Sequence, residues 1–362
     1  MERKVIFTVL LFYGLYYMFY LAGSDTKADD KDNSSIYEKI AAGKDYQYLV
    51  VGDSIGRGAG AENQELTWFS QLEELIRNEF GGKGTRHAVV QSGATAFEGI
   101  FKLQNTHMPD RIDAAFIVFG ENDRKYMDAG TFSAHYEKIV RHLIMHYPSA
   151  QIFTITENSL DQEEFAGEIS KITEYYGAVN IDMRVPFRDS GLTVQQLTTD
   201  LVHPNGKGYR LYAEQLFKVM SSVQQKTGQQ AELIKPLNPL ADIQLTEQSN
   251  YKEKKGFTFY NGLHVSTKQG DFIEYEFTGP ELGVTVLRSE FGGLMDVYID
   301  DAYHGSISTW WPIDKQRNLY IASGLGDRSH TVKFVVKDER SESNITNRAD
   351  IAISSIIIAE KQ

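Results

Sequence analysis

Hydrophobic residues between positions 46 and 225 gather in short runs, each followed by a polar turn and then by a helical pattern. The runs have the length of buried strands and lie at residues 48–51, 87–91, 114–119, 151–156 and 178–181. Apolar residues recur with the helical period at 67–76, 132–147 and 163–176, and again from 206 to about 225. Strands that alternate with helices predict an α/β domain with a doubly wound parallel sheet of five strands over residues 46–225.

After residue 245 the pattern changes to an alternation of apolar and polar residues, which is typical of half-buried strands. The clearest runs are 272–277, 282–287, 295–300, 331–336 and 351–358. Because glycine-containing turns separate these runs, we expect residues 246–362 to form an all-β sandwich, a jelly roll. Residues 226–245, which contain Pro236 and Pro239, are expected to be a linker.

The first 24 residues have the pattern of a membrane anchor. Arg3 and Lys4 precede an uncharged, mostly apolar stretch over 5–24, which as a helix would span roughly 30 Å, the thickness of the bilayer hydrocarbon. We favour a signal anchor over a cleaved signal peptide, because this stretch exceeds the usual apolar core of about 7–15 residues. The positive-inside rule then places the rest of the chain outside the cell membrane. Residues 25–45 are polar and charged and are expected to be a flexible stalk.

The amino-acid composition excludes several kinds of function and site. The chain has 362 residues and a formal net charge of −12, whereas nucleic-acid binding requires a basic face, so nucleic acid is not expected as a partner. It has no cysteine, which excludes disulfides, thiolate zinc sites and cysteine nucleophiles.

Polar residues that can carry acyl-transfer chemistry follow the ends of the predicted strands. Ser54 follows the first strand, and Asp200 and His203 lie in the loop after the last. Because the carboxyl ends of parallel strands meet at one edge of a sheet, these side chains can converge. Ser54 would then be the nucleophile, His203 its base and Asp200 the group that orients the imidazole. The backbone N–H groups of Ser54 and Gly93 and the side-chain amide of Asn122 can form the oxyanion hole.

With these residues the sequence resembles the SGNH (GDSL-type) hydrolases and esterases. The family's four blocks occur in order as Gly52-Asp53-Ser54, Gly93, Gly120-Glu121-Asn122-Asp123 and Asp200-Leu201-Val202-His203. The resemblance covers residues 46–225 and implies a flavodoxin-like sheet and a serine hydrolase that acts on ester bonds without a metal or organic cofactor. Two departures, Ile55 for the usual Leu and Gln91 for the Asn that begins the second block, affect no catalytic atom.

The expected sandwich resembles the jelly-roll module of carbohydrate acetyl esterases, although there it precedes the catalytic domain. This resemblance favours an exported esterase, anchored to the membrane or secreted, that removes small acyl groups, above all O-acetyl, from an envelope or extracellular polysaccharide. A lipid acyl hydrolase or thioesterase, an O-acyltransferase with the same triad and an inactive polysaccharide-binding protein are the alternatives. The acyl length, the glycan and the oligomeric state stay open.

Three further motifs can each be explained either by a structural role or by a functional one. His142 and His146 lie four residues apart on a predicted helix, but the apolar residues between them favour packing over a metal site. Trp310-Trp311 could stack on a sugar, although packing or an interdomain contact is favoured. Glu157-Asn158 follows the fourth strand and either lines the substrate pocket or simply ends that strand.

Overall fold

The computed structural model describes residues 34–222 and 233–360. The predicted anchor over 1–24 lies outside the described residues, as does the first part of the predicted stalk, residues 25–33. Within the two described ranges, no helix is both long enough and apolar enough to cross a membrane.

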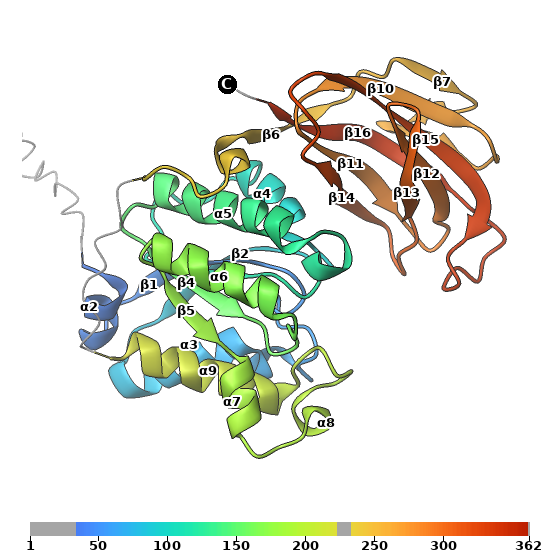
Figure 1. Ribbon diagram of the computed structural model, residues 1–362. Helices are drawn as coiled ribbons and strands as arrows, with labels where there is room; N and C mark the ends of the chain where they lie inside the picture. Colours follow the sequence, from blue (N-terminus) through green and yellow to red (C-terminus); the bar gives the residue numbers. More distant parts are fainter. Residues whose placement is uncertain (1–33, 223–232, 361–362) are drawn as a thin grey trace, which may run out of the picture. The chain divides into compact units, whose positions relative to one another are not determined.

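A five-stranded parallel sheet forms the centre of the first domain, as predicted. Its strands are β1 (Tyr46–Gly52), β2 (Gly84–Val90), β3 (Ala114–Val118), β4 (Gln151–Thr156) and β5 (Val179–Asp182). The strand order is β2-β1-β3-β4-β5, so the chain reverses its direction of winding between β1 and β3 (Figure 1). Ligands bind at such a switch point in open α/β sheets, beyond the carboxyl ends of the strands.

Helices cover both faces of this sheet. One face carries α3 (Trp68–Phe80) and α9 (Gly206–Met220), and the other carries α4 (Ala96–Gln104), α5 (Ala129–His146) and α6 (Glu163–Tyr175) (Figure 1). Short helices α7 (Arg184–Asp189) and α8 (Val194–Leu197) lie between β5 and α9. Each face of the sheet packs against its helices in a separate hydrophobic core, and successive residues of β1 point to opposite faces. Val50 lies in the core under α3 and α9, whereas Leu49 and Val51 lie in the core under α4, α5 and α6.

The stalk prediction is wrong for its last part. Helix α2 (Ile36–Ala41) lies within the range 25–45, and Ser35 caps it with Glu38 in a capping box. Ile36 and Ile40 are buried in the core of the α/β domain, and the Lys39 ammonium contacts the Asp113 carboxylate at 2.9 Å. The spacing of four places both isoleucines on one helix face, which the charged residues around them obscured.

The second domain is an antiparallel β-sandwich of two sheets. One sheet has the order β13-β12-β15-β10-β7, and the other β14-β11-β16-β9-β8, with β6 (Gln244–Gln248) beside β16. The first sheet contains β7 (Glu253–Lys255), β10 (Phe272–Thr278), β12 (Gly293–Ile299), β13 (Ala302–Ser308) and β15 (Ser329–Arg340). The second contains β8 (Thr258–Tyr260), β9 (Leu263–Ser266), β11 (Glu281–Arg288), β14 (Lys315–Ser323) and β16 (Ile351–Glu360).

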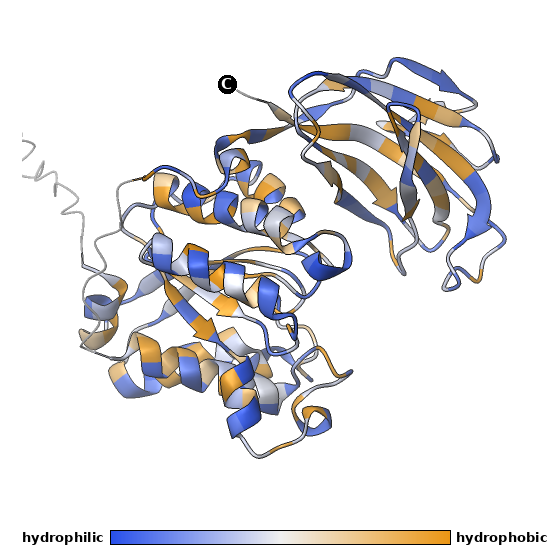
Figure 2. Ribbon diagram, viewed as in Figure 1, coloured by the Kyte–Doolittle hydropathy of each residue, from blue (hydrophilic) through white to orange (hydrophobic). Residues whose placement is uncertain are grey.

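From β9 to β16 the chain passes between the sheets in the strand order of a jelly roll. The five predicted strands correspond to β10, β11, β12, β15 and β16. Buried and more exposed residues alternate along β12 and β15, whereas residues 356–358 of β16 are three isoleucines in a row. Figure 2 colours these strands by hydropathy. The sequence analysis missed the shorter or more polar strands, of which β8 and most of β13 are exposed.

The described part of the predicted linker is fixed to the α/β domain. The Glu137 carboxylate of α5 accepts hydrogen bonds from the backbone N–H groups of Leu237 and Asn238 at 2.7 and 2.8 Å. On β11, the buried Glu281 contacts His135 at 2.7 Å and forms an ion pair with Lys138, both from α5. The two contacts of Glu281 attach the sandwich to α5.

Candidate active site

Ser54 lies on a tight turn immediately beyond β1. The Asp53 N–H still donates to the Val118 carbonyl at 3.1 Å, so the turn stays attached to the neighbouring strand β3. A side chain at position 52 would be crowded, because a Cβ there would lie 3.0 Å from the Val118 oxygen and 3.2 Å from the Gly56 Cα. The turn thus presents the Ser54 hydroxyl at the edge of the sheet, with 6% of the residue exposed.

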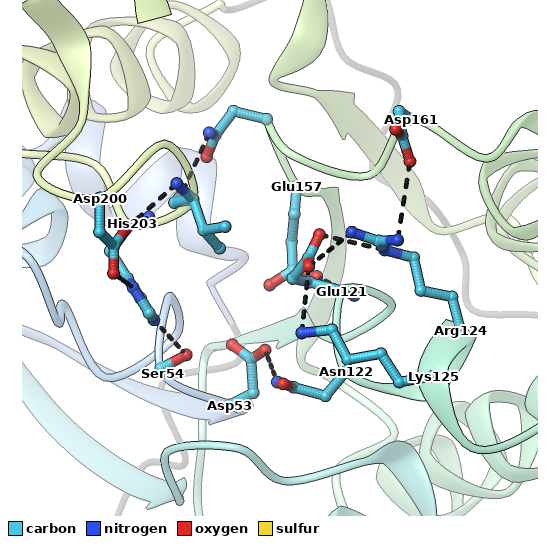
Figure 3. Close-up of polar contacts among 12 residues, drawn as sticks. Asp53, Ser54, Glu121, Asn122, Arg124, Lys125, Glu157, Asp161, Asp200 and His203 are labelled. Carbon is cyan, nitrogen blue, oxygen red and sulfur yellow. Dashed lines mark hydrogen bonds and ion pairs between the residues drawn. The ribbon is translucent and has the colours of Figure 1, made fainter. Parts of the chain in front are cut away.

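His203 and Asp200 come to Ser54 on the loop between α8 and α9. The His203 Nε2 lies 2.9 Å from the Ser54 Oγ, and its Nδ1 lies 2.7 Å from an Asp200 carboxylate oxygen (Figure 3). The other Asp200 oxygen accepts the backbone N–H groups of Val202 and His203 at 3.1 and 2.8 Å. Leu201 has a φ of +73°, a left-handed conformation rare for a residue with a side chain, and it folds the loop back on Asp200.

The hydrogen bonds around Asp200 favour its ionised form. Burial acts to raise the pKa of this carboxyl, but the backbone and ring N–H groups of His203 and the backbone N–H of Val202 outweigh it and lower the pKa. Asp200 therefore stays a carboxylate beside the imidazole, where it can hold the Nδ1 proton and stabilise an imidazolium.

Three groups near Ser54 can donate to a developing oxyanion. Among the contacts of the described residues, the backbone N–H groups of Ser54 and Gly93 have no acceptor. Gly93 has a φ of +73° and occupies a turn that the Ala94 N–H closes onto the Gln91 carbonyl at 3.0 Å. The Asn122 amide donates one hydrogen bond to Asp53 at 2.6 Å and has a second N–H to offer (Figure 3).

Three buried carboxyl groups lie under these loops, and the sequence analysis assigned none of them this supporting role. Asp53 holds the Asn122 amide and accepts the Ile55 N–H at 2.8 Å, Asp123 accepts the Ala96 N–H at 2.7 Å, and Glu157 accepts the Glu121 N–H at 2.7 Å. All three are fully buried. They thereby fix the loops that carry Ser54, Gly93 and Asn122.

Burial changes the protonation of this cluster. It raises the pKa of Asp53 to about 6 and that of Asp123 to about 8. Burial, reinforced by the charge of Asp53, holds the pKa of Glu157 well above its ordinary value. Glu157 is completely buried, so it does not line a substrate pocket. Its neighbour Asn158 does border a cavity of about 430 Å³, whose lining includes Leu201 and Val202.

The sandwich reaches the Gly93 loop. Arg317 of β14 donates to the Gly93 carbonyl at 2.9 Å, and a Cβ at Gly93 would lie 3.5 Å from the Trp311 ring. A cavity of about 290 Å³ beside them is lined by both domains, with Gly93 and Tyr126 from one and Arg288 and Arg317 from the other. Trp311 is thus in contact with the α/β domain, the interpretation that the sequence analysis favoured for this pair.

The two histidines on α5, His142 and His146, stack on each other. The His142 and His146 rings stack at 3.9 Å between centroids, and burial together with the charge of His146 lowers the pKa of His142 to about 4. Across the described ranges, no group of three or more potential ligands could hold a metal ion.

The comparisons with known proteins agree with this architecture. The sequence pattern of the GDSL-like Lipase/Acylhydrolase family matches residues 50–211. Crystal structures of a two-domain esterase (CEX) active on acetylated mannans are similar at 17% identity, covering 90% of this chain and 94% of that one. Their TM-scores are 0.69 for the complex with mannopentaose and 0.66 for the second structure. No curated protein matches the chain.

A parallel α/β sheet that carries these four sequence blocks is followed here by a β-sandwich. Over residues 50–211 the chain is similar to the GDSL-like lipase/acylhydrolase family, and it is a carboxylic ester hydrolase.

The protonated state of Asp123 predicts a pH-dependent stability. Its carboxyl has a pKa of about 8 in the folded protein against an ordinary value of 3.8, so between these limits the folded state holds a proton that the unfolded state has lost. Stability should therefore fall by about 1.4 kcal/mol per pH unit from this group as pH rises through that window. Asp123→Asn removes this dependence. Urea unfolding at pH 5, 6, 7 and 8 should therefore show that the unfolding free energy of the variant rises relative to that of the wild type as the pH increases.

The matched control is Asp189→Asn, on an exposed residue, whose unfolding free energy should run parallel to that of the wild type. Parallel curves for Asp123→Asn as well would contradict the assignment of a buried, protonated Asp123.

Proposed function

We propose that Ser54, His203 and Asp200 are the catalytic triad of this esterase, with the oxyanion hole formed by the N–H groups of Ser54 and Gly93 and the amide of Asn122. The observation that carries the proposal is the unbroken chain of contacts from the Ser54 Oγ through His203 to Asp200, with distances of 2.9 and 2.7 Å. Both distances are within hydrogen-bond reach, as a nucleophile and its base require.

The reaction follows from this geometry. The Ser54 Oγ attacks the ester carbonyl as the His203 Nε2 takes its proton, and the oxyanion forms against the three donors. The protonated His203 then gives the proton to the departing alcohol oxygen, which leaves an acyl group on Ser54. Water attacks this acyl-enzyme after losing a proton to His203, and the carboxylic acid leaves while Ser54 regains its proton.

The substrate we propose is a polysaccharide with small O-acyl groups, above all acetyl. Two observations support it. The structure that shares both domains belongs to an esterase active on acetylated mannans, and the sandwich reaches the Gly93 loop beside the proposed nucleophile.

We also propose that the enzyme is exported and held at the cell membrane by residues 1–24, with the catalytic domain outside. The uncharged stretch after Arg3 and Lys4 supports this. Fractionation of cells producing the full chain, followed by external protease treatment, should place the enzyme in the membrane fraction and leave it accessible. A protein recovered in the cytosol and protected from protease would contradict the proposal.

Loss of the nucleophile tests the triad directly. Ser54→Ala and His203→Ala should each lower kcat on an aryl acetate by about 10⁴-fold or more, and the double variant should be no worse, because triad members act as a unit. Circular dichroism should show that the variants stay folded. Wild-type turnover by purified Ser54→Ala would refute the assignment.

Loss of an oxyanion donor should appear in kcat alone. Asn122→Ala should lower kcat by about 10²–10³-fold with little change in KM, because the oxyanion exists only in the transition state and its intermediates. Steady-state kinetics on the same aryl acetate measure this. A change confined to KM would instead make Asn122 a substrate-binding residue.

The acyl preference tests the substrate. Across aryl esters from acetyl to octanoyl, kcat/KM should be highest for acetyl and fall steadily with chain length, and the enzyme should release acetate from an acetylated mannan. An optimum at octanoyl with no acetate released from the polymer would favour a lipid acyl hydrolase.

A further inference from the structure

The Gly93 loop has little in its own sequence to hold it still. Glycine has the broadest backbone freedom of any residue, and Gly93 adopts a φ of +73°. An oxyanion donor works only if it is fixed before the reaction, so something must restrain this peptide. Within the described chain, the Gly93 carbonyl accepts a hydrogen bond from one group, the Arg317 guanidinium of the sandwich.

Arg317 is itself rigidly held. It lies on β14 with 1% of its surface exposed. Its Nε contacts both oxygens of Glu98 at 3.1 and 3.0 Å, and its Nη2 contacts one of them at 2.7 Å. The same Nη2 donates to the Gly93 carbonyl at 2.9 Å. The planar guanidinium therefore binds two points at once, the Gly93 carbonyl before α4 and the Glu98 carboxylate within α4. The smaller ammonium group of a lysine does not have donors spread widely enough to make all of these contacts.

Neighbouring groups strengthen this attachment. The Arg317 pair outweighs the burial that would raise the pKa of Glu98, and the pKa is lowered, so Glu98 is ionised. The Trp311 ring lies beside the loop, 3.5 Å from the position that a Cβ on Gly93 would take, and the Arg317 Cζ is 5.3 Å from the ring centroid. On the other side of the loop, the buried Asp123 accepts the Ala96 N–H. The loop is thus held between a carboxyl of its own domain and a guanidinium of the sandwich.

We propose that Arg317 is a positioning residue for ester hydrolysis. It fixes the Gly93 peptide so that the Gly93 N–H is held ready for the oxyanion, and the β-sandwich thereby completes the active site in addition to any contact with a polymer. This inference rests on the proposed oxyanion hole. It predicts that the sandwich affects turnover of even the smallest ester.

The chain provides a matched control at the same domain contact. Glu281 of β11 forms the second buried interdomain ion pair, with Lys138 and His135 of α5, and none of these residues contacts Ser54, Gly93 or Asn122. Weakening this pair disturbs the attachment of the sandwich without touching the Gly93 carbonyl.

The test removes both charges of the first pair together. Glu98→Leu with Arg317→Met removes both charges of this pair. Lys102, which also pairs with Glu98, loses that partner but is partly exposed to solvent. Apolar replacements of buried ion pairs are often neutral for stability. On an aryl acetate, kcat should fall about 10- to 100-fold with KM within about twofold, as a displaced donor predicts. The affinity for phenylboronic acid, a probe that forms a tetrahedral adduct on a reactive serine, should fall by a similar factor.

The control, Glu281→Gln with Lys138→Met, should keep kcat near the wild-type value. Should the first double variant fail to fold, Arg317→Lys keeps a positive charge beside Glu98 and should still lower kcat in a protein that circular dichroism shows to be folded. Wild-type kcat in a folded Glu98→Leu/Arg317→Met protein, or an equal loss in the control, would overturn the proposal. Wild-type turnover by Ser54→Ala would instead refute the triad itself.

Discussion

The register of the parallel sheet is the constraint on which the site depends. Gly52 at the end of β1 pairs with Val90 of β2 and with Val118 of β3, so these three strands end level with one another. Ser54, Gly93 and Asn122 follow those strand ends within a few residues. In the proposed mechanism, side chains and N–H groups from these three loops meet at one reacting carbon. A slip in either pairing would separate them by about 3.3 Å per residue.

Under this edge the protein buries acidic groups that it does not neutralise with basic ones. Asp53, Asp123 and Glu157 each accept a backbone N–H of a loop at the site, and burial raises the pKa of all three. Burying ionisable groups costs stability unless hydrogen bonds compensate. The gain is rigidity, since each carboxyl ties down a loop that must not move when charge develops above it.

Helix α4 is the element that joins the two domains. Its first residues follow the Gly93 turn, and most of its side chains are buried because the parallel sheet lies on one side and β14 of the sandwich on the other. Phe97, for example, packs against Tyr320 of the sandwich, with 5.7 Å between ring centroids. The sequence analysis did not predict this helix, although its apolar residues recur with the helical period as clearly as those of α6 and α9.

The sequence alone predicted the α/β sheet and the sandwich, and it supplied the candidate residues of the proposed site. Long apolar runs and strict alternation are local signals, and Ser54, Gly93, Asn122, Asp200 and His203 follow from strand ends and from blocks of neighbouring residues. Only the tertiary structure decided what surrounds them. The packing of α2, the raised pKa values of Asp53 and Asp123, and the contact of Arg317 with Gly93 depend on residues far apart in the chain, 224 positions in the last case. Burial and long-range hydrogen bonds have no period in a sequence, so they become visible only once the chain is folded.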